Sequence, residues 1–157
     1  MPNLIVPTVV RTLHNIFTSI WIGGMLVTVL SFLPVIRKEI TDKKLQGILL
    51  DAFMKRHSKW VYLGIAILAL TGLLMGRLSG KTHGLFDFSN PYAAILSVKH
   101  ILMIIITAIA IVRSTAFKNT ASGKDMAKKK ASMALLMVNT VLGTVILVLS
   151  SITAVIG

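Results

Sequence analysis

The stretch that decides the fold is residues 92–112, which read YAAILSVKHILMIIITAIAIV. This run can cross a bilayer as a helix, which takes about 20 mostly apolar residues, and its only acidic or basic side chains are Lys99 and His100. Three further apolar stretches lie at 13–36, 60–76 and 133–156. Because a bilayer offers no water to the backbone, each stretch must be helical. The sequence therefore predicts an all-α integral membrane protein.

The composition of the whole chain agrees with this prediction. Of the 157 residues, 55% are hydrophobic and 14% are charged, where soluble domains carry about a quarter. The chain has no cysteine, which excludes a disulfide scaffold and a Cys-ligated zinc or iron–sulfur site. We expect one domain over 1–157, a four-helix bundle with spans near 8–36, 58–78, 92–113 and 132–156. Pro34 is expected to kink or stop the first helix.

The basic side chains predict the topology of this bundle. Seven of the 17 Lys and Arg residues lie in 37–59 and six lie in 113–130. The positive-inside rule places both segments in the cytoplasm. With four spans, both termini are then outside the cytoplasmic (inner) membrane. No aromatic residue is interleaved with the lysine run, so the net charge of +12 indicates anionic lipid headgroups and not nucleic acid.

Two histidines inside the predicted spans are functional candidates, because ionisable groups are costly in a bilayer. His14 lies seven residues after Pro7, and His100 lies nine residues after Pro91. At about 1.5 Å per residue, both fall roughly 10–14 Å from the outer helix ends. Counting from the cytoplasmic ends instead gives an offset of roughly 15 Å. We prefer the outer count, because proline fixes a helix start.

Two imidazoles at one depth on the first and third helices suit the axial positions of a b-type haem. Basic side chains on the same side would pair with the haem propionates; these are Arg11, Arg77, Lys81 and, within the third span, Lys99. A protein of this kind would carry out electron transfer or membrane redox chemistry. Its partner would be a quinone or another redox protein.

Two other interpretations stay open at this point. Copper would find imidazole ligands in His14, His100 and His83, with Met103 as a soft thioether ligand. Alternatively, the chain is a small structural subunit of a larger membrane complex, and its histidines only make hydrogen bonds between helices.

Two further polar residues receive structural interpretations. His57, between Arg56 and Ser58, is expected to be solvated at the level of the inner headgroups. Asn139 is the one amide in the fourth span, and it is expected to make a hydrogen bond between helices.

Several short motifs are spread along the chain. They are Leu13-His14, Trp21-Ile22-Gly23-Gly24-Met25, Phe53 with Lys55-Arg56, Thr71-Gly72, and Tyr92 with Val98-Lys99. Together they resemble the copper-resistance CopD family, and this resemblance implies copper uptake or tolerance across the cytoplasmic membrane. The spacing from His14 to Trp21, with Pro34 following, also resembles the HemJ-type protoporphyrinogen oxidases. That second resemblance implies haem b, with His14 as a functional residue.

Overall fold

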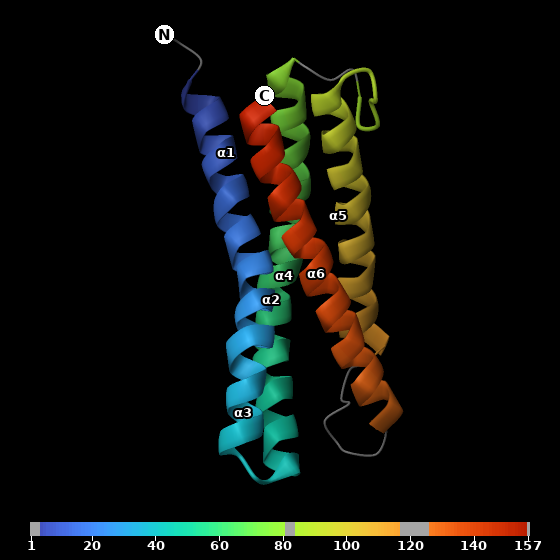
Figure 1. Ribbon diagram of the computed structural model, residues 1–157. Coiled ribbons are helices and arrows are strands. Elements are labelled where there is room, and N and C mark those ends of the chain that lie inside the picture. The colour runs from blue at the N-terminus through green and yellow to red at the C-terminus, as the bar shows by residue number, and fades with distance from the viewer. Residues whose placement is uncertain (1–3, 81–83, 117–125, 157) are drawn as a thin grey trace.

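The computed structural model describes residues 4–80, 84–116 and 126–156, and these form a bundle of four long helices (Figure 1). The first is continuous from Ile5 to Glu39, the second is α4 (Lys43–Ser79), the third is α5 (Pro91–Ala116) and the fourth is α6 (Met126–Ile156). All four are long and apolar enough to span a membrane. The predicted all-α membrane fold is confirmed, and the chain is a multi-pass membrane protein.

The first long helix contains two wider turns. It runs through α1 (Ile5–Thr18), the π segment η1 (Ser19–Gly23), α2 (Gly24–Val27), a second π segment η2 (Thr28–Phe32) and α3 (Leu33–Glu39). Pro34 is the second residue after η2, and the helix continues past it to Glu39 instead of stopping there. Short π segments inside α-helices are frequent at functional sites, and η1 carries the buried Trp21.

Local sequence signals set the ends of the next two helices. Asp42 caps α4, because its carboxylate accepts hydrogen bonds from the backbone N–H groups of Lys44 (2.7 Å) and Leu45 (3.4 Å). Gly80 ends α4 in the left-handed conformation (φ 63°) that favours glycine. At the start of α5, Asn90 Oδ1 accepts from the Ala93 N–H at 2.8 Å. Most of the basic segment 37–59, from residue 43 onward, is therefore the first part of α4.

The four helices associate as two pairs. The first long helix packs along α4, and α5 packs along α6. The pairs meet mainly where α6 crosses η1, α2 and η2. Toward the end where α3 is joined to α4, the α5–α6 pair diverges from the other (Figure 1). We call this end, which carries Arg37, Lys38, Lys43, Lys44 and Lys128–Lys130, the basic end.

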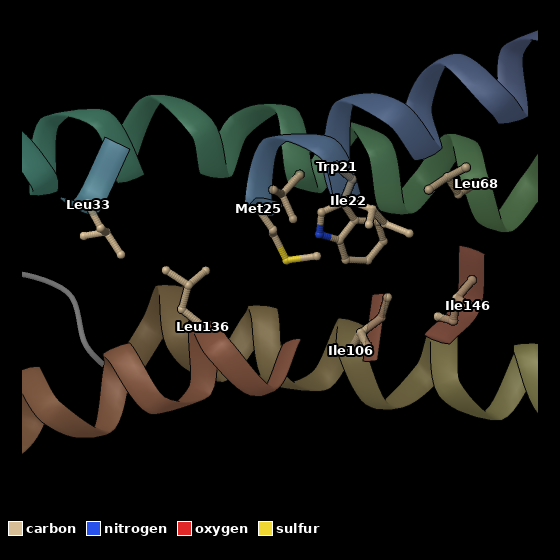
Figure 2. Close-up of a cluster of buried hydrophobic side chains, with 9 residues drawn as sticks. Trp21, Ile22, Met25, Leu33, Leu68, Ile106, Leu136 and Ile146 are labelled. Atoms are coloured by element: carbon tan, nitrogen blue, oxygen red, sulfur yellow. The ribbon is translucent and has the colours of Figure 1, made fainter. Parts of the chain in front are cut away.

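The core lies in one layer between the two pairs. Figure 2 shows Trp21, Ile22 and Met25 facing Ile106 and Leu136 across this layer. A Cβ at Gly143 of α6 would lie 3.2 Å from Ile22 Cγ2 and 3.3 Å from Met25 Cε. The absence of a side chain at Gly143 therefore lets α6 approach the first helix closely. Large apolar side chains on the outer surface, such as Leu30, Leu70 and Val141, are more than 60% exposed, as expected for a lipid-facing surface.

Candidate functional site

His14 lies at the contact between the first helix and α4. Its Nδ1 is 2.9 Å from Thr71 Oγ1, and its ring packs beside Gly72, where a Cβ would lie 3.6 Å from His14 Cε1. Thr71 also donates to the Ile67 carbonyl of its own helix at 2.7 Å. The structure thus joins two short motifs, Leu13-His14 and Thr71-Gly72, that are far apart in the sequence.

His100 points toward a different part of the protein. Its Nδ1 is 2.9 Å from the carbonyl oxygen of Leu85 in the connection between α4 and α5. The neighbouring Lys99 reaches α6, with Nζ 3.4 Å from Thr153 Oγ1. Successive side chains on a helix point about 100° apart, so the two basic residues serve different helix surfaces.

The structure gives no support to the expected haem site. His14 Nδ1 lies against Thr71 of α4, whereas His100 Nδ1 lies against the Leu85 carbonyl in the connection between α4 and α5. Arg11 and Arg77 are exposed, while Lys81 and His83 lie outside the described residues. Met103 packs against the apolar core. Over residues 4–80, 84–116 and 126–156, no group of three or more His, Asp or Glu side chains could hold a metal.

A cavity of about 260 Å3 lies between the two helix pairs, on the side of the core toward the basic end. All four long helices contribute to its wall. The residues that matter for its chemistry are Trp21, Met25, Asp51, Met54, Lys55, His57, Arg113, Lys129, Met133 and Asn139. We call this space the inter-pair cavity. It is smaller than most pockets for drug-sized ligands, which measure about 300–1,000 Å3.

Three described residues that carry a buried polar atom without a partner line the inter-pair cavity. In the described part of the chain, three buried side-chain nitrogen or oxygen atoms lack a hydrogen bond: Trp21 Nε1, His57 Nε2 and Asn139 Oδ1. All three residues line this one cavity. Leaving such an atom unsatisfied costs about 1–3 kcal/mol, so the inter-pair cavity is the candidate functional site.

His57 is held in this wall by ring contacts. Its imidazole stacks on Phe53 with ring centroids 5.8 Å apart and planes at 9°, and Phe53 stacks on Phe32 at 4.2 Å. The Cε1 atom of the ring also lies against Gly24, where a Cβ would overlap it. The expectation that His57 is solvated is therefore wrong, because the residue is half-buried and its Nε2 is buried. The reason is that this stretch is already part of α4, and one face of α4 packs on the first helix.

Asn139 is buried on α6 at 1% exposure. Its Oδ1 has no hydrogen-bond partner among the described residues. The expectation that the amide group makes a hydrogen bond between helices stays a prediction.

Arg113, near the end of α5, is half-buried in the same wall. Its Nη2 donates to the thioether sulfur of Met54 at 3.6 Å, which joins α5 to α4. Next to it, the hydroxyl groups of Tyr62 and Ser114 form a second hydrogen bond between these two helices.

Residues 51–155 match the family model of copper resistance protein D, CopD. The chain belongs to the CopD family. The matched range holds about two thirds of the chain, from α4 to the end of α6, and includes most of the lining of the inter-pair cavity. It also includes the motifs at Phe53, Thr71-Gly72 and Val98-Lys99, whereas the first-helix motif around Trp21 lies before it. No match was found among curated proteins or solved structures.

Sequence reasoning directed attention to the outer histidines and missed the inter-pair cavity. One signal was available. Met54, His57 and Val61 recur at the spacing of one helical face, as do Met133, Leu136 and Asn139. A helix face that carries thioether, imidazole and amide groups among apolar residues is unlike a face that contacts only lipid or an apolar core. This difference is the signal for a site.

Proposed function

We propose that this CopD-family protein binds Cu(I) in the inter-pair cavity and contributes to copper uptake or tolerance at the membrane. The observation that carries the proposal is the family match over 51–155. The cavity supplies a chemically suitable place, because soft thioether and imidazole groups are the donors that Cu(I) prefers.

The donor set comes from three of the four long helices. Met25 lies on the first long helix, Met54 and His57 on α4, and Met133 on α6, and all four residues line the cavity. His57 Nε2 has no hydrogen-bond partner among the described residues, so no hydrogen bond would have to break for this nitrogen to coordinate copper. Ligands from helices of both pairs would let bound copper stabilise the contact between the pairs.

The proposal also assigns an orientation. We place the basic end in the cytoplasm and both termini outside the inner membrane, because Lys and Arg gather at the basic end. The inter-pair cavity would then open toward the cytoplasmic half of the membrane. The haem interpretation, with His14 and His100 as axial ligands and a quinone as partner, has less support than copper in both the geometry and the family.

A competition titration tests the proposal. Purified protein in detergent is titrated anaerobically with Cu(I) against a chromophoric Cu(I) chelator, and we expect one Cu(I) per chain. Met54→Leu and Met133→Leu should each weaken binding by about tenfold or more, the effect of losing about 1.4 kcal/mol. Leucine keeps the side-chain volume, so the fold should tolerate both changes.

Met75→Leu is the matched control, because Met75 lies on α4 but does not line the cavity. Its affinity for Cu(I) should equal that of the wild type. A protein that binds no Cu(I), or that loses affinity equally in the control, would overturn the proposal. A purified protein that carries stoichiometric haem with a low-spin spectrum would restore the haem interpretation.

A further inference from the structure

Arg113 has far more hydrogen-bonding capacity than the surrounding protein uses. A guanidinium group carries five N–H donors and no acceptor. Its one hydrogen bond to a described residue goes to the Met54 thioether, which is a weak acceptor. A half-buried cation with only this partner has a strong requirement for an anion.

Other donors face the same space. The Trp21 indole N–H is buried and unpaired, and Figure 2 shows its nitrogen on the side of the ring nearer Met25 and Leu136. Lys129 and Lys55 also line the inter-pair cavity, and Asp51 is the one acid among its described lining residues. Asp51 already takes part in another interaction. The wall is therefore cationic, with N–H donors contributed by several helices.

We infer that the inter-pair cavity binds a phosphate group at Arg113, either as the headgroup of an anionic lipid or as free phosphate. Arginine recognises phosphate through paired, charge-assisted hydrogen bonds, and the Trp21 N–H can add a donor from the opposite helix pair. Asn139 Oδ1, an unpaired acceptor in the same wall, would accept from a hydroxyl group of the phosphate or of its glycerol.

The position of the cavity favours phosphate over other anions. Arg113 lies near the end of α5, at the basic end of a membrane-spanning bundle. Basic pockets between membrane helices at this level are suited to lipid phosphates. A volume of about 260 Å3 corresponds to the space of roughly eight or nine water molecules at ~30 Å3 each. That space admits a phosphate with a small ester group, and the acyl chains would stay outside.

This inference goes beyond the proposed copper function and does not depend on it. If both hold, the phosphate would offset the positive charge of Arg113 and Lys129, which otherwise opposes entry of a copper ion into the same space. Each ligand can nevertheless be measured without the other.

Native mass spectrometry of the copper-free protein tests the inference. Delipidated protein in detergent is mixed separately with phosphatidylglycerol, phosphatidylcholine or inorganic phosphate, and the bound fraction is followed. We expect phosphatidylglycerol to be retained about tenfold more tightly than phosphatidylcholine, whose choline cation would meet the cationic wall.

Arg113→Gln should reduce retention of phosphatidylglycerol by about tenfold or more, in line with the loss of a charge-assisted hydrogen bond. Arg56→Gln is the matched control, since Arg56 is exposed on α4 and does not line the cavity. Trp21→Phe removes the N–H donor together with part of the volume of a buried ring, and it should weaken binding less than the loss of Arg113. It keeps the test valid if the Arg113 variant does not fold.

The outcomes separate the two sources of phosphate. Retention of phosphatidylglycerol that depends on Arg113 assigns the site to a lipid headgroup. Binding of inorganic phosphate with no preference among lipids, again lost in Arg113→Gln, assigns it to free phosphate. Equal losses in the Arg113 and Arg56 variants, or no binding of either ligand, would overturn the inference. Because copper is absent throughout, none of these results bears on the copper proposal.

Discussion

Replacing Gly24 by alanine would push a methyl group into the His57 imidazole. The Cβ position at Gly24 overlaps ring carbon Cε1 and lies 3.2 Å from Nε2 and 3.3 Å from Nδ1. The ring also stacks on Phe53, and any shift away from Gly24 would disturb this contact. Gly23, the preceding residue, has no heavy atom within 4 Å of the same position. The two neighbouring glycines therefore provide a matched pair of sites.

The expected difference follows from two opposing terms. Alanine is favoured over glycine within a helix by about 1 kcal/mol, and both variants receive this gain. Overpacking a tight contact costs about 1–3 kcal/mol, and only Gly24→Ala carries this cost. We therefore expect Gly23→Ala to be as stable as the wild type or more stable, and Gly24→Ala to be less stable than Gly23→Ala by about 1–3 kcal/mol.

Unfolding of the purified protein by SDS in mixed micelles, followed by tryptophan fluorescence, measures this difference. Displacement of His57 should also weaken Cu(I) binding in Gly24→Ala, while Gly23→Ala retains it. Equal unfolding midpoints for the two variants would refute the contact between His57 and the first helix. Unchanged Cu(I) affinity in Gly24→Ala would refute the role of the imidazole as a ligand.

Three further changes test other parts of the structure. Thr71→Val should lower the free energy of unfolding by about 0.5–1.5 kcal/mol in the same assay, because it removes the partner of His14. Thr144→Val is the control and should cost less, since the Thr144 hydroxyl donates to its own helix. Equal effects of the two changes would contradict the hydrogen bond of His14. Asn139→Leu should raise the free energy of unfolding by about 1 kcal/mol, since it removes a buried unpaired oxygen, and it should weaken phosphate retention. A lower free energy of unfolding would mean that the amide already has its hydrogen bonds. A reporter fused after Gly157 should be active only outside the cytoplasm, and cytoplasmic activity there would reverse the orientation.

The four spans were predictable because hydropathy and length alone decide whether a segment can cross a bilayer. Residues 92–112 meet this criterion without reference to any other part of the chain. The start of α5 could also be predicted from the local sequence, since Asn90 and Pro91 cap it. Pro34 was expected to kink or stop the first helix, but the helix continues to Glu39 after the wider turns of η2. No feature of the sequence indicated these wider turns.

The candidate site was harder to predict, because it depends on which helix faces meet. Pro7 and Pro91 gave depths for His14 and His100, but depth does not determine the direction in which a side chain points. His100 faces the connection before α5 and Lys99 faces α6, and a rotation of about 100° would exchange them. His57 was assigned to the headgroup region because charged neighbours surround it in sequence. Its burial follows only from the packing of α4 on the first helix.

The pairing of the helices has a consequence for how the protein is made. Since most contacts lie within the two pairs and few lie between them, each pair is a helical hairpin that can enter the bilayer and become compact before the other is present. Association of preformed helices is the later step in membrane protein folding, and here it would centre on the crossing at Gly143. A chain cut between Gly80 and Gly84 and expressed as two halves should therefore reassemble in the membrane. A bulkier residue at position 143 should block that reassembly while leaving each half inserted.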